Sequence, residues 1–159
     1  MKRLKVDLNE LVSEMEMGEN IELAGYLDTE TGEIISMPDE VMRSVEDGEE
    51  KIERLPDWEQ ELVETAENIL GDEKNRFLLI PKSESREGYE TMAAFANSVR
   101  GKGLRDKLAI ALNGKGAFRR FRSVLNEHPD ELEQWYTFKD DWMRAEAIKW
   151  LVMNGIEPS

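Results

Sequence analysis

The last third of the chain contains one long stretch with helical periodicity, and this stretch constrains the fold more than any other feature. Pro129 and Asp130 are typical of a helix start, and the pattern continues to Gly155, a residue type common at helix ends. Apolar side chains recur along it at helical spacing, namely Trp135, Phe138, Trp142, Ala145, Ile148 and Leu151. Because such a stripe has to be covered by other elements, we expect this helix to pack within a helical cluster.

A small amount of β-structure is predicted earlier in the chain. The segment IELAGYLDTETGEIISMP, residues 21–38, predicts two strands joined by a turn in which Gly32 has a positive φ. The apolar run RFLLIP, residues 76–81, fits a buried third strand, which would support a hairpin that is only marginally stable alone. Between them, residues 58–71 predict a helix with Trp58 on its apolar face. After the third strand only helices are expected.

These patterns together predict an α+β protein that is mostly helical. The N-terminal hairpin and the third strand would form a small antiparallel sheet packed against a C-terminal helical cluster. The length of 159 residues suits a single domain over 1–159, made of a hairpin-containing α+β part, 1–82, and a helical part, 83–159. Hydrophobic residues make up 40% of the chain and charged residues 35%, which is enough for a core beneath a heavily charged surface.

The composition also bears on where the protein works. The chain contains no cysteine, which is compatible with a reducing compartment. Asp7 and Glu10 interrupt the apolar run that a secretion signal would need after the basic start, and no run reaches the roughly 18 apolar residues of a membrane span. We therefore expect a cytoplasmic protein that makes no membrane contact.

The charge is large and unevenly distributed. The formal net charge is −14, which disfavours binding of long nucleic acids, although nucleic acid stays open as a partner. Residues 98–122 contain eight Lys and Arg but only one acidic residue, so this segment carries +7 and the rest of the chain −21. A basic segment in so acidic a chain is the strongest sequence signal for a binding site.

The centre of this basic segment is LNGKGAFRRFRSVL, residues 112–125. Two glycines precede a helix, and the free N–H groups at a helix start attract anions. We therefore predict an anion or partner site formed by Gly114, Lys115, Gly116, Arg119, Arg120 and Arg122. Its ligand would be a phosphorylated molecule or an acidic protein segment. The alternative is that the glycines only form a turn while the arginines pair with the protein's own carboxylates.

Two phenylalanines alternate with the arginines of this segment. Aromatic rings beside arginine can stack on nucleobases, which would require Phe118 or Phe121 to be exposed. Their spacing continues to Val124 and Leu125, which favours a buried face instead. We therefore predict that Phe118, Phe121 and Leu125 are part of the core.

The sequence gives little support to catalysis. His128 is the only histidine, no serine lies in a Gly-x-Ser-x-Gly turn, and no calcium-binding loop spacing occurs. We predict no cofactor and no metal, and favour a non-enzymatic binding or regulatory module. Two alternatives stay open: a small hydrolase or phosphotransferase that uses the basic pocket, and a structural accessory protein whose basic segment meets the acidic remainder of another copy.

Three blocks of the sequence carry a resemblance to a known family. They are YLDTETGEII at 26–35, SESREGYETMAAF at 83–95, and the long block at 114–158 that begins with GKGAFRRF. The chain resembles an uncharacterised bacterial family, the uncharacterised protein family one-five-eight. That family has no established activity, so the resemblance implies no catalytic residues, but it marks the GKGAFRRF block as a characteristic part of the chain.

Overall fold

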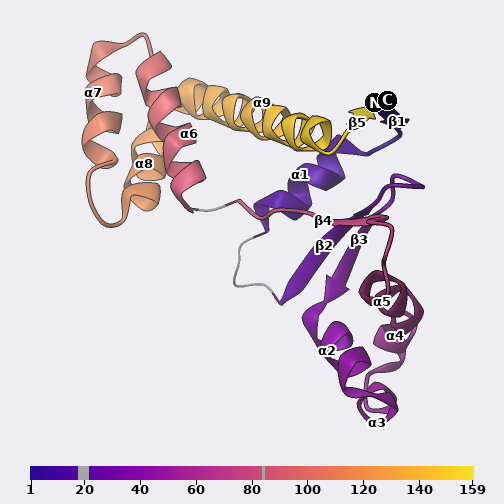
Figure 1. Ribbon diagram of the computed structural model, residues 1–159. Coiled ribbons are helices and arrows are strands. Elements are labelled where there is room, and N and C mark those ends of the chain that lie inside the picture. Colours follow the sequence, from indigo (N-terminus) through magenta and orange to yellow (C-terminus); the bar gives the residue numbers. More distant parts are fainter. Residues whose placement is uncertain (18–21, 84) are drawn as a thin grey trace. The chain divides into compact units, whose positions relative to one another are not determined.

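The computed structural model describes residues 1–17, 22–83 and 85–159, and it divides the chain into two compact units (Figure 1). Unit 1 comprises Met1–Lys82 and Ala147–Ser159, and unit 2 comprises Ser83–Glu146. The described strands all lie in unit 1, whereas unit 2 is built from helices. The α+β class predicted from the sequence, with more helix than strand, is therefore confirmed.

A three-stranded antiparallel sheet forms the centre of unit 1. Its strand order is β3 (Ile34–Pro38), β2 (Leu23–Asp28) and β4 (Phe77–Leu79). Gly32 has φ 81° in the turn between β2 and β3, and a Cβ atom at this position would overlap the carbonyl oxygen of Lys5. Because both the backbone angle and the space require glycine there, the predicted hairpin turn is confirmed. The third strand is confirmed as well, but its predicted burial is wrong, since the side chain of Leu79 is 61% exposed.

Helices cover both faces of this sheet. On one face, Tyr26 and Ile35, which are paired across the strands, pack against a core of Met37, Val41, Leu55 and Ala66. That core is supplied largely by α2 (Asp39–Asp47) and α5 (Val63–Leu70). On the other face lies α1 (Leu8–Glu16), whose buried Glu14 accepts a hydrogen bond from the hydroxyl of Ser36. Successive side chains of a strand point to opposite faces of the sheet, so neighbouring residues pack against different helices.

Two further strands pair the ends of the chain and were not expected from the sequence. Strand β1 (Lys2–Leu4) runs parallel to β5 (Ile156–Pro158), so the expectation of helices alone after the third strand is wrong. Each strand has only three residues, which is too short for an alternating pattern to be recognised. Their pairing depends on a contact between opposite ends of the sequence.

The predicted helix over residues 58–71 is interrupted. It consists of α4 (Asp57–Gln60) and α5, and it follows the short helix α3 (Glu49–Glu53). The prediction for Trp58 is wrong, since its side chain is 61% exposed while the neighbouring Glu59 is buried. The break shifts the buried face of α4 by one position, which turns the tryptophan towards solvent.

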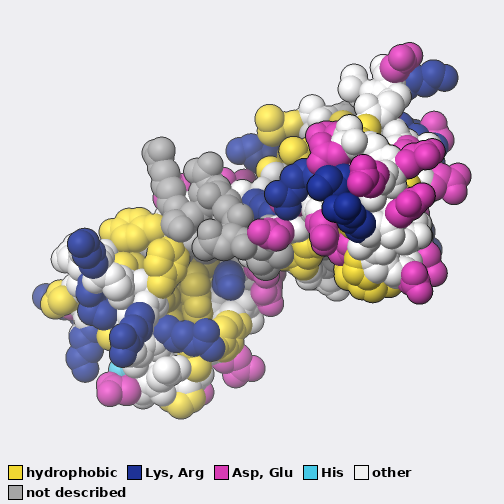
Figure 2. All heavy atoms as spheres, turned by 90° about the horizontal axis from the view of Figure 1, so that it is seen from below, with side chains coloured by type: hydrophobic (Ala, Val, Ile, Leu, Met, Phe, Trp, Pro, Cys, Tyr) yellow, Lys and Arg dark blue, Asp and Glu magenta, His cyan; other side chains and the backbone are white. Residues whose placement is uncertain are grey.

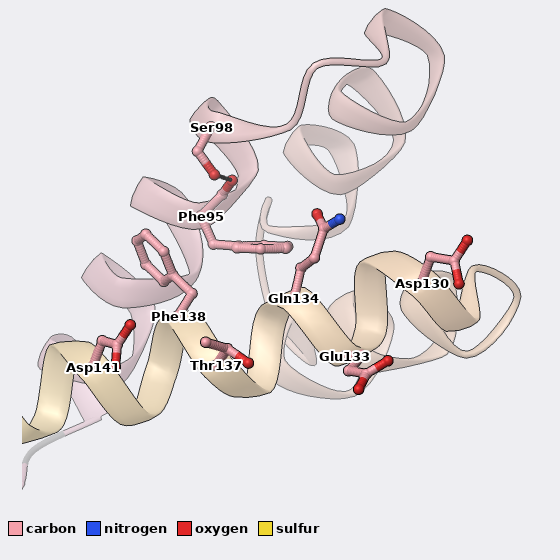
Figure 3. A pocket seen from close by; sticks show the side chains of 8 residues that line it. All are labelled: Phe95, Ser98, Asp130, Glu133, Gln134, Thr137, Phe138 and Asp141. Atoms are coloured by element: carbon pink, nitrogen blue, oxygen red, sulfur yellow. Dashed lines mark hydrogen bonds between the residues drawn. The ribbon is translucent and has the colours of Figure 1, made fainter.

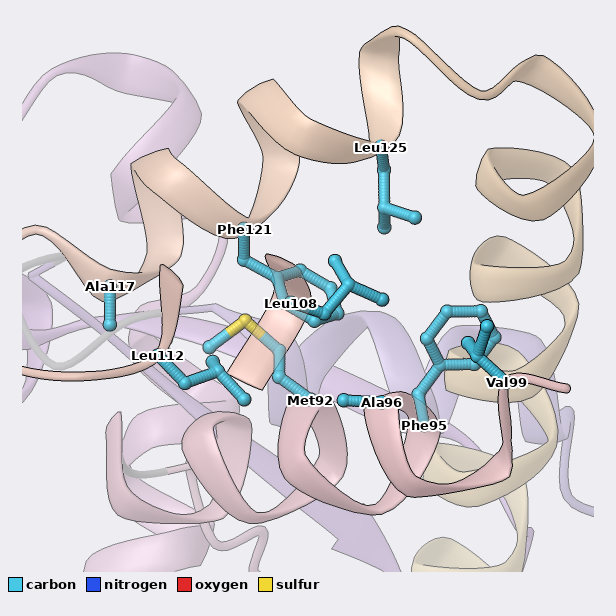
Figure 4. Packing of buried hydrophobic residues seen from close by; sticks show 9 residues of the cluster. All are labelled: Met92, Phe95, Ala96, Val99, Leu108, Leu112, Ala117, Phe121 and Leu125. Atoms are coloured by element: carbon cyan, nitrogen blue, oxygen red, sulfur yellow. The ribbon is translucent and has the colours of Figure 1, made fainter. Parts of the chain in front are cut away.

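Unit 2 packs three helices and the first part of a fourth around one hydrophobic core. The helices are α6 (Ser85–Ser98), α7 (Lys102–Ala111), α8 (Ala117–Asn126) and α9 (Pro129–Met153). Phe95, Phe121 and Trp135 contact one another, with ring centroids 5.1 to 6.3 Å apart. Figure 4 shows the buried side chains of α6, α7 and α8 converging on this core. The predicted burial of Phe121 and Leu125 is confirmed, and Trp135 and Phe138 are partly buried against the same cluster.

The prediction for Phe118 is wrong, because its side chain is 51% exposed. The buried residues of α8 are Ala117, Phe121 and Leu125, which follow one another at four-residue spacing. Phe118 is one position away from this stripe, and one residue turns a side chain by about 100° around a helix. The sequence interpretation joined Phe118 to the buried face because its three-residue spacing from Phe121 is also compatible with one face of a helix.

Candidate functional site

The loop between α7 and α8 holds the Gly-Lys-Gly sequence in a tight left-handed turn. Gly114 has φ 80° and Gly116 has φ 77°, angles at which a side chain costs about 1–2 kcal/mol. Gly116 also precedes the first residue of α8, and no side chain caps that helix end. The first N–H groups of α8 are therefore left without a side-chain acceptor, as an anion-binding helix start requires.

Arg120 holds this loop together. Its guanidinium donates to the carbonyl oxygen of Ala111 at 3.1 Å and to the carbonyl oxygens of Asn113 and Lys115. It thereby ties the last turn of α7 to the loop and satisfies carbonyl groups that a helix end leaves open. Arg120 has donors committed to the protein's own backbone, which distinguishes it from the other cations of the segment.

The remaining cations of the segment face solvent. Lys115, Arg119 and Arg122 are exposed, and none of them lies within 4.0 Å of a carboxylate of the described residues. Arg122 donates through Nη2 to the hydroxyl of Tyr136, 3.2 Å away on α9. The alternative interpretation, in which the arginines pair with the protein's own carboxylates, therefore does not describe the ion pairs found in this part of the chain.

The exposed Phe118 lies beside these cations and contacts α6. A Cβ atom added to Gly88 would lie 3.1 Å from Cε1 of Phe118, so the ring approaches the α6 backbone closely. Phe118 and Arg122 are four residues apart on α8 and therefore share a face of that helix. Sequence reasoning missed this arrangement because it assigned Phe118 to the core.

The net charge is divided sharply between the two units. Unit 2 contains 11 Lys and Arg and 11 Asp and Glu, so its net charge is zero and the −14 of the chain belongs to unit 1. Figure 2 shows Asp and Glu gathered on unit 1, whereas the visible face of unit 2 carries Lys and Arg beside hydrophobic side chains. The environment of the candidate site is thus less acidic than the whole chain suggests.

A groove of about 700 Å³ lies elsewhere in unit 2, between α6 and α9 (Figure 3). It is lined by Phe95, Ser98, Asp130, Glu133, Gln134, Thr137, Phe138 and Asp141. The three carboxylates would repel an anion, so this groove does not extend the basic site. No sequence signal indicated it, because its walls come from segments more than 30 residues apart.

A partly buried ion pair in unit 1 had no signal in the sequence. The carboxylate of Asp28 accepts from Arg76 at 3.0 Å from Nε and 2.8 Å from Nη2. The backbone N–H of Glu30 donates to the same carboxylate at 2.9 Å. Arg76 chiefly, with this backbone bond, lowers the pKa of Asp28 to about 2. Both oxygens of Asp28 accept hydrogen bonds from within the protein. Because Asp28 ends β2 and Arg76 precedes β4, the pair holds the start of β4 against the end of β2.

The described residues include one histidine and many carboxylates. Among them, no group of three or more His, Asp or Glu side chains is arranged to hold a metal ion. His128 is half-buried between α8 and α9, where its backbone N–H donates to Leu125 and its carbonyl accepts from Leu132. The described helices also include none long and apolar enough to span a bilayer.

Comparison with known proteins places the chain in a family. The sequence model of the Uncharacterised protein family (UPF0158) matches residues 1–159. The chain belongs to the UPF0158 family. It is 31% identical over 91 residues to the UPF0158 protein PA5073 of Pseudomonas aeruginosa, a match that covers 57% of this chain and 60% of that protein. No solved structure matches. The resemblance found in the sequence is therefore confirmed, and the relative is bacterial, but UPF0158 membership brings no assigned activity.

Proposed function

We propose that this protein is a cytoplasmic binding or regulatory module whose ligand is anionic. The site would consist of the turn at Gly114 and Gly116 with the exposed cations Lys115, Arg119 and Arg122. Arg120, the fourth cation of the segment, would hold the turn in place. The observation that carries the proposal is the group of three exposed cations that lack a carboxylate partner beside an uncapped helix start.

Two physical effects would act together at this site. The first N–H groups of α8 carry the positive end of the helix dipole, which is worth about 0.3–1 kcal/mol for a nearby anion. Arg119 and Arg122 can each donate two parallel hydrogen bonds to a phosphate or carboxylate. The −14 charge on unit 1 is screened beyond about 8 Å at physiological ionic strength, so the site would act on ligands that reach it locally.

The experiment compares two double variants. Lys115→Ala with Arg119→Ala removes two cations of the site, whereas Arg43→Ala with Lys51→Ala removes two exposed cations from unit 1. Binding of tripolyphosphate and of a hexaglutamate peptide is measured by calorimetry for each protein. We expect the site variant to bind at least one probe more weakly, by at least about 10-fold, with an unchanged melting temperature, because each charge-assisted bond that is lost contributes about 1.5–3 kcal/mol.

The same experiment can reject the proposal. If the control variant loses as much affinity as the site variant, binding follows overall charge and the site is wrongly placed. If neither probe binds the unaltered protein, the anion site does not exist. A solution mass that rises at low salt and falls at high salt, without probe binding, would instead support the accessory protein that associates with its own copies.

A further inference from the structure

We propose that the ligand of this surface is a single strand of nucleic acid, with bases stacked on Phe118 and Tyr136 and phosphates bound by Lys115, Arg119 and Arg122. This inference rests on the proposed function and names its ligand class. It follows from the rings that lie beside the cations. Phe118, Tyr136, Lys115, Arg119 and Arg122 together form a ring-and-cation surface.

Phe118 is placed as a stacking platform rather than as a core residue. Half of its side chain is exposed, at 51%, while the ring edge is held against the backbone of α6 at Gly88. A ring supported on one side and open on the other can receive a base without first having to be ordered. Stacking of a base on an aromatic side chain is tolerant of sequence, because every base has a flat face.

Tyr136 adds a second exposed ring to the ring-and-cation surface. Its side chain is 42% exposed, and its hydroxyl accepts the hydrogen bond from Arg122. Arg122 shares a face of α8 with Phe118, since four residues separate them. The three side chains therefore form a series of ring, guanidinium and ring, which matches the alternation of bases and phosphates along a single strand.

The exposed rings of Phe118 and Tyr136 favour one class of anionic ligand over the others. An acidic peptide or a simple phosphate would use the cations but would leave Phe118 and Tyr136 exposed to water. A duplex keeps its bases stacked inside and could use only the cations. A single strand is the anion that would cover both kinds of side chain at once.

Acidic neighbours limit the length of strand that can bind. Glu87 is exposed beside Gly88 on α6, and Glu133 and Asp140 are exposed within about one turn of Tyr136 on α9. The acid-lined groove between α6 and α9 would repel phosphates as well. The ring-and-cation surface therefore suits a segment of a few nucleotides, whose path is confined to the cations of α8 and the preceding loop.

The test uses the full chain and fluorescence anisotropy with a labelled oligouridine RNA of about eight nucleotides, its DNA counterpart and a duplex of the same length. Phe118→Leu removes the ring but keeps an apolar side chain, and Phe118→Trp restores a ring. Ile110→Ala is the control, because Ile110 is an apolar residue of α7 that is 69% exposed. All variants are first checked for an unchanged melting temperature.

We expect Phe118→Leu to weaken binding of the single strand by about 5- to 150-fold, the range that corresponds to loss of one stacked base. Phe118→Trp should bind as well as the unaltered protein, and Ile110→Ala should have no effect. Raising the salt from about 50 to 200 mM should weaken binding about 20-fold, since three phosphate contacts give a slope near −2 for single strands.

The outcomes separate this inference from the proposed function. If tripolyphosphate binds and the oligonucleotides bind no better, or if Phe118→Leu leaves their affinity unchanged, the single-strand inference is overturned while the anion site stands. Tighter binding of the duplex or of hexaglutamate than of the single strand overturns the inference equally. If no anionic probe binds, both fail. If Phe118→Leu does not fold, the affinities of Phe118→Trp and Tyr136→Leu for the single strand are compared instead. A loss of affinity in Tyr136→Leu alone supports the inference. Equal affinity of these two variants overturns it.

Discussion

Acid titration should break the ion pair between Asp28 and Arg76 and thereby destabilise the fold. The pKa of Asp28 is lowered from its ordinary value of 3.8 to about 2, chiefly by the hydrogen bonds from Arg76. Each tenfold change in the acid dissociation constant corresponds to about 1.4 kcal/mol, so ionised Asp28 contributes about 2 kcal/mol to the free energy of unfolding. Because the pKa in the folded state is the lower one, this contribution is complete above about pH 4 and disappears as the pH falls towards 2.

The assay is urea unfolding of the unaltered protein and of Asp28→Asn between about pH 7 and pH 2. At neutral pH we expect Asp28→Asn to be less stable by at least about 2 kcal/mol, because the asparagine cannot form a charged pair with Arg76. The difference between the two proteins should shrink as the pH falls from about 4 towards 2, where Asp28 itself becomes protonated. Subtracting the unfolding free energies of the two proteins cancels the contribution of the other carboxylates. One of these is Asp72, whose pKa is lowered by hydrogen bonds from the backbone of Phe77 and Arg76.

Glu30 provides the matched control for this prediction. Its carboxylate lies 3.4 Å from Nη1 of Arg76, but its side chain is 61% exposed, in contrast to 4% for Asp28. Exposed ion pairs contribute only about 0–1 kcal/mol, so Glu30→Gln should change the unfolding free energy little. A difference between the unaltered protein and Asp28→Asn that stays constant over the whole titration would refute the argument, because the lost stability would then not come from ionisation.

Three further changes test other parts of the structure. Phe121→Ala should destabilise the protein by about 3–5 kcal/mol in urea unfolding, since the ring is 1% exposed in the core of unit 2, and a value near zero would contradict that packing. Arg120→Ala should cost about 1–2 kcal/mol through loss of the loop hydrogen bonds, and Arg120→Lys should restore little of it, which melting curves would detect. Burial, and then Glu40, raises the pKa of Glu59, so the stability that protonated Glu59 provides is lost as the pH rises through that pKa. Glu59→Gln should therefore be at least as stable as the unaltered protein at neutral pH, and a destabilisation that grows with pH would disprove this.

Several parts of the fold could be read from the sequence because local rules determine them. The hairpin follows from Gly32 between two strand-forming segments, and its positive φ is a property of the turn itself. The long helix begins at Pro129 and continues to Met153, close to the predicted end, because capping and periodicity act within a few residues. The third strand was recognised from a short apolar run bounded by charge and proline.

Other features could not be read from the sequence, because they depend on contacts between distant segments. The pairing of β1 with β5 joins the two ends of the chain, and neither strand has a pattern of its own. The pair of Asp28 and Arg76 joins residues 48 positions apart, in segments that resemble ordinary polar turns. Trp58 was misplaced for a related reason, since the buried face of a four-residue helix is decided by what packs against it.

The candidate site shows the same division between local and tertiary causes. Two glycines and a cluster of cations at the start of a helix were predictable from the sequence, because the backbone angles of glycine and the charge of a side chain are properties of the residues. The sequence could not determine that Arg120 would donate hydrogen bonds to the backbone carbonyls of the loop, since that depends on how α7 and α8 meet. Nor could the sequence show that the side chain of Phe118 would be exposed. A side chain's burial is decided by the helix that faces it, and here α6 presents Gly88, which leaves half of the ring in solvent.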